Sequence, residues 1–482
     1  MKKKSGFILA LILVFLVVLT FMQFGMFAII SPEFFFLTRQ KAYITALHVA
    51  DAGIEDALDQ LQSGNFNNFS GSLTPSIPSN SPVLGTYQVT ITADPGNAFD
   101  TYKMYQVTSY STLSARTSVH KTVQAVVESI SFGDYLYFTD HEYTSDGVRI
   151  WFRMGETVDG PMFSNDQVSI NWNGYQGNPP IFQTKLTSPY SPNWNPQAPT
   201  GTQWDLIFTN GTSGLETGVG NIPFPPPTNV QKLASLGGMT APTTTGITIP
   251  NNAGVANGGI YIQGNAKKIL LGMTSSNQTI QITQVISSQN KISTITINPT
   301  ANTTTLKKPD NSTIVYTGTT NGVIYVNGDI QDLSGTVQSR MSLVTNAANS
   351  TTITGNIQLT QDPIANPSFD GMLGLVSGNI ILPSTAPSNI IIQAAMIAGQ
   401  NSTTGSFYYV NYDQSPTKGN LNILGSLSQE VRGKVGTFNP STGTLSTGYS
   451  KNYHFDTRLA LRPPPYFPTT GKYRVRFWKK LN

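Results

Sequence analysis

The stretch FILALILVFLVVLTFMQFGMFAII, residues 7–30, contains no charged residue, and only Thr20 and Gln23 interrupt it with polar side chains. As a helix it would be roughly 36 Å long, whereas the hydrocarbon core of a bilayer is about 30 Å thick. Lysines occupy positions 2–4, and the cytoplasmic flanks of membrane helices are rich in Lys and Arg. The sequence therefore predicts a single-pass membrane helix, with a cytoplasmic N-terminus and an extracytoplasmic body.

The helical pattern continues beyond the apolar stretch. Pro32 is expected to kink the helix, because proline lacks an N–H group and clashes with the preceding turn. Apolar side chains then recur every three or four positions from Leu47 to Leu61, with acidic residues between them. This spacing is typical of an amphipathic helix. We therefore expect one transmembrane and amphipathic helix over residues 7–62.

Two motifs in this region point to a family. Residues 1–6 read Met-Lys-Lys-Lys-Ser-Gly directly before Phe7, and Ala50-Asp51-Ala52-Gly53 opens an acidic helical turn. Together they resemble the N-terminus of PilX-type minor type IV pilins, in which residues 1–6 would be a prepilin-type leader. The resemblance implies cleavage between Gly6 and Phe7, methylation of the new terminus, and packing of the helix against other pilin-like subunits.

One position departs from the pattern of major pilins. Those proteins carry a Glu at the fifth mature residue, where this sequence has Leu11. The resemblance therefore implies a low-copy or tip subunit. A generic signal anchor is the alternative, with residues 50–53 as an ordinary turn of helix. A cleaved secretory signal fits poorly, because its apolar region would be only about 7–15 residues long.

The body of the chain is predicted to be mainly β. Residues 83–130 alternate β-branched or aromatic residues with polar ones, and the turn-forming residues 94–97 separate two of the runs, so a small meander is expected. Residues 131–250 are an irregular region of short strands and loops that holds most of the tryptophans. Aromatic side chains on such loops either stack on sugar rings or pin the loops to a core, and pinning is the favoured interpretation.

Residues 251–430 contain a repeat of the form apolar-x-Gly-x-apolar. Its glycines are Gly335, Gly355, Gly378, Gly399 and Gly425. A period of 20–50 residues is typical of stacked coils, so we expect a parallel β-solenoid-like domain whose corner Asn, Ser and Thr form ladders between coils. An irregular antiparallel sandwich is the alternative. Residues 431–482 are expected to form a C-terminal cap or tail.

Three segments of the body resemble an uncharacterised bacterial β-rich domain that follows PilX-like N-termini. They are residues 159–165, 322–330 and 463–468. No activity comes with that resemblance.

The chemistry of the sequence argues against an enzyme. The chain has no Cys, only 11% charged residues and a net charge of +4 without a basic stripe, so thiol chemistry and nucleic-acid binding are not expected. No known catalytic motif occurs, and no cofactor is predicted. One acidic cluster, Asp134, Asp140, Glu142 and Asp146, could hold Ca²⁺, although a plain polar loop is the simpler interpretation.

These observations predict a minor pilin-like structural subunit of a type IV filament or related assembly, at the cell surface or in a pilus. Its β-rich head would serve adhesion or assembly. Its expected partners are sister subunits, the inner membrane and a glycan or cell-surface ligand. The alternatives are a membrane-anchored envelope protein outside any filament and a solenoid enzyme acting on polysaccharide.

Overall fold

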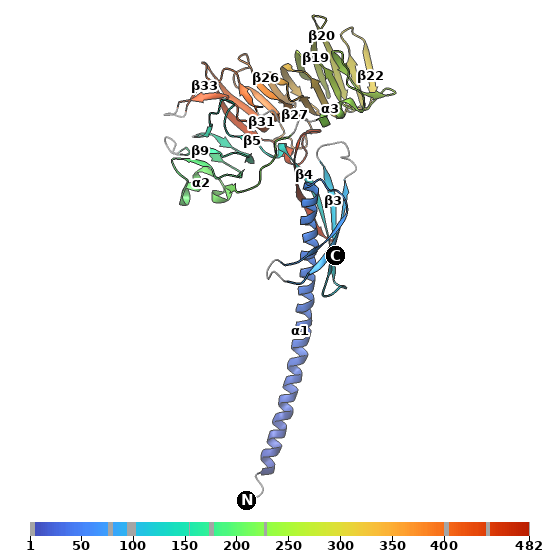
Figure 1. Ribbon diagram of the computed structural model, residues 1–482, viewed down its shortest axis with the longest axis vertical. Coiled ribbons are helices and arrows are strands. Elements are labelled where there is room, and N and C mark those ends of the chain that lie inside the picture. The colour runs from blue at the N-terminus through green and yellow to red at the C-terminus, as the bar shows by residue number, and fades with distance from the viewer. Residues whose placement is uncertain are drawn as a thin grey trace. The chain divides into compact units, whose positions relative to one another are not determined.

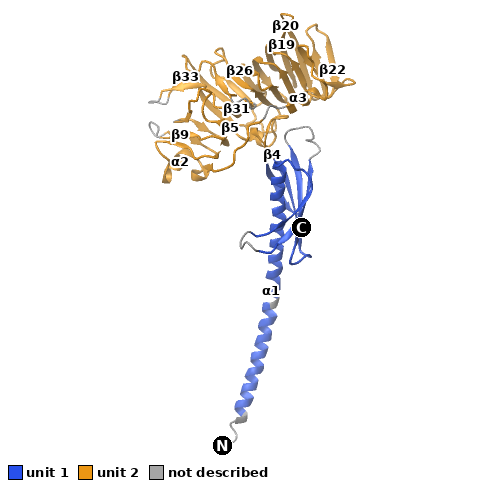
Figure 2. Cartoon of the chain, in the orientation of Figure 1, with its two compact units in different colours: residues 1–98, 103–128, 473–482 blue, residues 99–102, 129–472 orange. Residues whose placement is uncertain are grey.

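The computed structural model describes residues 5–75, 81–93, 103–153, 155–172, 178–225, 229–399, 404–439 and 444–481. These residues are mainly β, with one long N-terminal helix (Figure 1). The chain forms two compact units (Figure 2). Unit 1 comprises residues 1–98, 103–128 and 473–482, and unit 2 comprises residues 99–102 and 129–472. Residues 1–4 of the predicted leader and the predicted turn at 94–97 lie outside the described residues.

Helix α1, Ser5–Gln62, is the long element of unit 1. It runs through Pro32 without a break in the helix, so its apolar and amphipathic parts are one continuous element. Its last turns pack on a five-stranded sheet in the order β1-β2-β3-β4-β34. The strands are β1 (Phe69–Leu73), β2 (Gly85–Ala93), β3 (Met104–Leu113), β4 (His120–Ser131) and β34 (Thr469–Lys480).

Close packing of α1 on this sheet depends on small side chains. Ala46, Ala50 and Ala57 are fully buried there. A Cβ added at Gly53 would overlap the side chains of Ser109 and Tyr87. The small residues at three- and four-residue spacing therefore let the helix approach the strands closely, as the amphipathic pattern predicted.

The first part of unit 2 consists of short strands and turns. Its strands are β5 (Tyr137–His141), β6 (Trp151–Phe152), β7 (Thr157–Val158), β8 (Met162–Ser164), β9 (Ser169–Asn171), β10 (Ile181–Phe182), β11 (Leu186–Ser188), β12 (Asn193–Asn195) and β13 (Leu215–Thr217). Its helices are η2 (Phe132–Asp134), η4 (Gly201–Gln203), α2 (Trp204–Ile207), η5 (Gly211–Gly214) and α3 (Asn229–Leu236).

Further strands follow. They are β14 (Gly246–Thr248), β15 (Asn251–Asn252), β16 (Val255–Ala256), β17 (Ile260–Gln263), β18 (Lys268–Thr274), β19 (Asn277–Ile286), β20 (Gln289–Asn298), β21 (Thr303–Lys307) and β22 (Thr313–Thr317). The last elements are β23 (Val323–Asn327), β24 (Ile330–Val337), β25 (Arg340–Thr345), β26 (Ser350–Leu359), β27 (Met372–Ser377), β28 (Asn379–Leu382), β29 (Ile391–Ala398), β30 (Phe407–Tyr409), β31 (Thr417–Val431), β32 (Gly436–Phe438), β33 (Leu445–Phe455) and η6 (Thr457–Ala460).

Both parallel and antiparallel pairings occur in the large sheet of unit 2. Strands β17, β23, β25, β27, β29 and β31 pair in parallel, each with the next. Strand β31 then pairs in parallel with β5, and β5 with β8, so the two ends of the unit meet in one sheet. Strands β18 to β22 instead form antiparallel hairpins.

Side-chain amides also connect residues at the ends of neighbouring parallel strands. The amide of Asn346 donates to Asn327 Oδ1 at 3.3 Å, and the amide of Asn327 donates to Gln263 Oε1 at 3.0 Å. Gly335 has a φ of +122°, and a Cβ there would overlap the Leu271 carbonyl oxygen. The repeat glycines are not alike, however, because no positive φ occurs at Gly355 or Gly378.

Candidate functional site

The first candidate surface is the apolar half of α1. The side chains described from Phe7 to Leu37 are all exposed, and Phe27 reaches 75% exposure. Among the described residues, α1 is the one helix long and apolar enough to cross a membrane. The described residues leave this surface uncovered, and an exposed apolar helix of this length is favoured in a bilayer or against other apolar helices rather than in water.

The predicted site residues are distributed along this helix. Gly6 and Phe7 lie in its first turn, and Pro32 lies within the exposed part. Of the Ala50-Asp51-Ala52-Gly53 motif, Ala50 and Gly53 face the sheet, whereas Asp51 and Ala52 are half-buried. Asp51 accepts a hydrogen bond from Trp478 Nε1 at 3.0 Å, a contact that spans nearly the whole chain and that local sequence reasoning missed.

The predicted acidic cluster is not assembled, because each carboxylate has its own partner at 2.7 Å. The donors to Asp134, Asp140, Glu142 and Asp146 are Ser131 N, Asn165 Nδ2, Arg432 Nη1 and Lys434 Nζ, respectively. In the described part of the chain, no group of three or more His, Cys, Asp or Glu residues is placed to hold a metal ion. The geometry therefore gives the calcium hypothesis no support.

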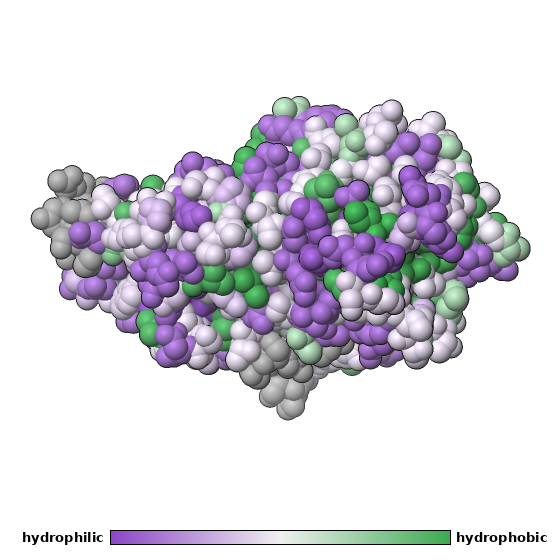
Figure 3. All heavy atoms as spheres, turned by 90° about the horizontal axis from the view of Figure 1, so that it is seen from above, coloured by the Kyte–Doolittle hydropathy of each residue, from purple (hydrophilic) through white to green (hydrophobic). Residues whose placement is uncertain are grey.

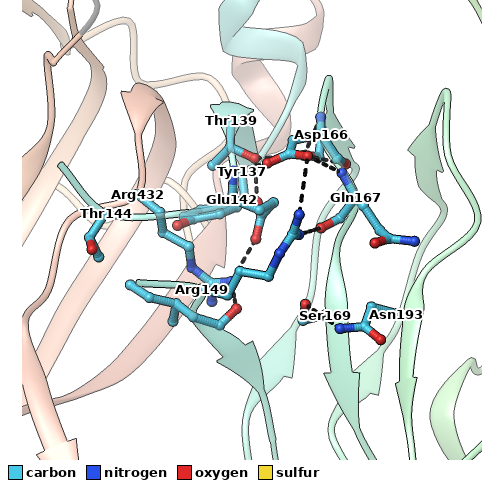
Figure 4. A network of polar contacts seen from close by, with 12 residues as sticks. Tyr137, Thr139, Glu142, Thr144, Arg149, Asp166, Gln167, Ser169, Asn193 and Arg432 are labelled. Carbon is cyan, nitrogen blue, oxygen red and sulfur yellow. Dashed lines mark hydrogen bonds and ion pairs between the residues drawn. The ribbon is translucent and has the colours of Figure 1, made fainter. Parts of the chain in front are cut away.

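Glu142 belongs instead to a polar network that joins distant parts of unit 2 (Figure 4), and Asp146 pairs with Lys434. Glu142 and Arg432 are fully buried and form an ion pair at 2.7 Å. Arg432 Nη1 also donates to the Ile150 carbonyl at 3.0 Å, and the guanidinium lies 4.0 Å from the ring centre of Phe152. Separating a buried pair of this kind typically costs about 3–5 kcal/mol, so the contact clamps residues 142–152 to the end of β31.

Asp166 extends the network on the other side of Glu142. One of its oxygens accepts the Glu142 N–H at 3.0 Å, and the other accepts the Gln167 N–H at 2.7 Å. Arg149 lies beside them and donates to the Gln167 carbonyl at 2.9 Å (Figure 4). The loop after β5 is therefore fixed to the segment that connects β8 and β9.

A second buried ion pair lies close to the first. Lys451 Nζ is 3.4 Å from Glu156 Oε1, and both side chains are largely buried. Burial lowers the pKa of Lys451 to about 8, although Glu156 opposes this shift. Burial also raises the pKa of Tyr137, which lies beside Arg432. The two pairs, Glu142 with Arg432 and Glu156 with Lys451, therefore form a buried region in which each charged side chain has an oppositely charged partner.

A hollow of about 360 Å³ adjoins this network. It is lined by residues 144–146 and 432–434, together with Asn379, Thr404, Ser406, Tyr408 and Tyr412. We call it the Tyr412 hollow. It was not foreseen, because its segments are separated by more than two hundred residues of sequence.

The tryptophans of residues 131–250 serve mainly as packing groups. Trp194 and Trp204 meet edge to face, with ring centres 5.6 Å apart, and Trp204 stacks on Phe208. Trp172 donates its Nε1–H to the Gln197 carbonyl at 2.7 Å. These three rings pack against the core, which agrees with the pinning interpretation.

Comparison with known protein families, curated proteins and solved structures finds no match to this chain.

Proposed function

We propose that this protein is a minor pilin-like structural subunit, held in the inner membrane by α1 and presenting a large extracytoplasmic β-rich head for adhesion or assembly. One observation carries the proposal. A single continuous helix is exposed and apolar over residues 7–37 and then buries its small side chains against its own sheet. That combination suits a helix in which the first half contacts lipid or neighbouring helices and the second half packs on the protein's own sheet.

The energetics favour an apolar environment for the exposed half. Apolar surface gains roughly 25 cal/mol for each Å² removed from water, and each Leu, Ile, Phe or Val at the centre of a membrane helix favours insertion by about 0.3–0.6 kcal/mol. Glu33 is the one charged residue between Phe7 and Leu37, and it lies near the end of the stretch. The same surface would suit the core of a helical filament.

The head has a different surface. Figure 3 shows mostly hydrophilic or neutral residues, with hydrophobic residues in small groups. The parallel stacking from β17 to β31 supports our proposal that residues 251–430 form a solenoid-like body. Such a body would offer long polar faces to glycans, cell surfaces or sister subunits.

The acids of the repeat region favour a structural role over polysaccharide cleavage. Asp329 accepts hydrogen bonds from Asn349 and the Ser350 N–H, and Asp332 pairs with Lys268 at 3.1 Å. These carboxylates satisfy neighbouring turns and strands. A glycosidase would instead need two carboxylates flanking one scissile bond.

The mature N-terminus tests the proposal. The full chain would be coexpressed with a prepilin peptidase, and the terminal peptide identified by mass spectrometry. We expect a terminus at Phe7, with or without a methyl group, and retention of residues 1–6 in a Gly6→Val variant. Gly25→Val is the matched control and should be processed normally. A wild-type chain that keeps Met1 to Ser5 would contradict the proposal and favour an anchored envelope protein.

Whether the protein enters an assembly is tested by disulfide cross-linking. The chain has no cysteine, so an introduced cysteine is its only thiol. A single cysteine placed at Val14 or Val18 should form disulfide-linked dimers with a partner helix that carries a matching cysteine. A cysteine at Gln60, in the part of α1 that packs on the sheet, serves as the comparison. Equal cross-linking at both levels would argue against side-by-side packing of the apolar halves.

A further inference from the structure

The Tyr412 hollow has the size of a small-ligand site. Its volume of about 360 Å³ lies within the range of about 300–1,000 Å³ that is usual for such sites. It is lined by loop residues 144–146, by residues around β30 and by the backbone that follows β31. All of these segments belong to unit 2 and lie among the described residues.

The walls of the hollow are held in place by ion pairs. Lys434 Nζ bonds to Asp146 at 2.7 Å and donates to the Tyr412 hydroxyl at 3.3 Å. Arg432 is fixed by its ion pair with the buried Glu142. Its backbone N–H also donates to the carbonyl oxygens of His141 and Tyr143 at 3.2 Å. A ligand would therefore meet a preformed surface, which lowers the entropic cost of binding.

The charges around the hollow cancel. Lys434 is neutralised by Asp146, and Arg432 by Glu142. A charged ligand would have to compete with one of these pairs, whereas a neutral ligand would leave both intact.

The remaining lining residues offer aromatic rings and hydrogen-bonding groups, which are the two kinds of group that a sugar ring binds. Tyr408 and Tyr412 are both partly exposed and present aromatic rings, with electron-rich faces that attract weakly positive C–H groups. Ser145, Thr404 and Asn379 add hydroxyl and amide groups that both donate and accept hydrogen bonds. A pyranose ring carries C–H groups on one face and hydroxyl groups around its rim.

We propose that the Tyr412 hollow binds a neutral carbohydrate of one or two rings, which stacks on a tyrosine and bonds to the hydroxyl and amide groups. Its use in adhesion rests on the proposed function, because the head must be displayed outside the cell. Sugar binding itself does not depend on how the N-terminus is processed. The two proposals therefore fail in different experiments.

Binding would be measured by calorimetry on the full chain in a detergent with a headgroup that contains no sugar. The neutral probes are maltose, lactose and N,N′-diacetylchitobiose, and 3′-sialyllactose is the acidic probe. We expect at least one neutral probe to bind with a Kd of about 1 mM or tighter. Raising NaCl from about 50 to 500 mM should change that Kd less than about twofold, since no net charge is involved.

Variants locate the site. Tyr412→Ala should weaken binding about tenfold or more, whereas Tyr412→Phe, which keeps the ring, should lose less. Tyr190→Ala removes a tyrosine that is 52% exposed elsewhere in unit 2 and should bind as the wild type does. Thermal melting would show that each variant is folded. The proposal is overturned if no neutral probe binds, if only sialyllactose binds, or if folded Tyr412→Ala retains wild-type affinity.

Discussion

The two halves of α1 are both apolar helix, yet they meet different surroundings. Residues 7–37 are rich in large Phe, Leu, Ile and Val side chains, and those described are exposed. Between Ala46 and Leu61 the buried side chains are mostly smaller and meet the strands of unit 1. Apolar character alone therefore does not say where a helix segment is buried. The size of the side chains and the acids between them distinguish the half that this chain covers from the half that it leaves uncovered.

The largest difference should come from truncating a buried side chain. Ile54 is 3% exposed in the core of unit 1, so Ile54→Ala should lower the free energy of unfolding by about 3–4 kcal/mol through lost burial and a residual cavity. Ile30→Ala makes the same change at a side chain that is 53% exposed. It should leave the unfolding of unit 1 unchanged in denaturant titrations in detergent. Equal losses at both sites would mean that the two halves do not differ as described.

An introduced charge should have its larger effect in the exposed apolar half of α1, and the effect is on membrane insertion. Val18→Arg places a cation at the middle of the apolar half, which should oppose membrane insertion by about 3 kcal/mol. Glu55→Arg places the same side chain on the exposed face of the sheet-bound half and should not affect insertion. The measurement is the fraction of protein that stays with membranes after alkaline carbonate extraction. If Val18→Arg stays in the membrane as fully as Glu55→Arg, the apolar half does not span the bilayer.

Substitutions at two glycines test the same difference between the halves of α1, with a smaller expected change in stability. Gly53→Ala should destabilise unit 1 by about 1–3 kcal/mol, because the new methyl group would overlap Ser109 and Tyr87. Gly25→Ala meets no atom within 4 Å and should increase the intrinsic helix preference by about 1 kcal/mol. Thermal melting followed by circular dichroism would measure both. A neutral Gly53→Ala would show that helix and sheet are less closely packed than described.

The smallest effect concerns pH. Tyr87 donates its hydroxyl to Asp56, and burial together with that carboxylate raises the pKa of Tyr87 to about 12. Because the raised pKa favours the neutral phenol in the folded state, its stabilising contribution is present below pH 10. That contribution is lost as the pH rises from about 10 to 12. Tyr87→Phe should therefore show a smaller loss of unit 1 stability over this interval than the wild type in alkaline denaturant titrations.

The apolar half of α1, residues 7–37, provides the reference for the pH experiment. Residues 7–37 contain Glu33 and no tyrosine, so membrane association should stay constant between pH 10 and 12. A wild type and a Tyr87→Phe variant that lose stability in parallel would show that this tyrosine does not carry the effect.

Local patterns predicted the elements that depend on neighbouring residues. The uninterrupted apolar run gave the exposed half of α1, and the three- and four-residue spacing from Leu47 to Leu61 gave the buried half. Alternation of side chains marked the segments that form β2, β3 and β4. Helices and strand faces are set by residues close in sequence, so these features could be inferred from the sequence alone.

Contacts between distant residues could not be inferred in this way. Residues 431–482 are predicted to form a C-terminal cap or tail, and their local pattern does not indicate that β34 within them joins the sheet of unit 1. The acids near Asp140 are close in sequence, yet their partners include Arg432 and Lys434, almost three hundred residues away. The sequence of a strand edge or of an acidic segment does not show which distant residue will pair with it. The Tyr412 hollow depends on such distant contacts, including those of Arg432 and Lys434.

The position of β34 has a consequence for how the protein is made. This strand lies at residues 469–480, whereas α1 leaves the ribosome first. The sheet on which α1 packs is therefore complete only after nearly all of the polypeptide has been synthesised. A prematurely terminated product would lack Arg474 and Arg476, which bind the buried Glu128, and the Trp478 contact to Asp51. Synthesis of the C-terminal strand is therefore a condition for the complete packing of α1, so loss of the last residues would alter unit 1 at the opposite end of the chain.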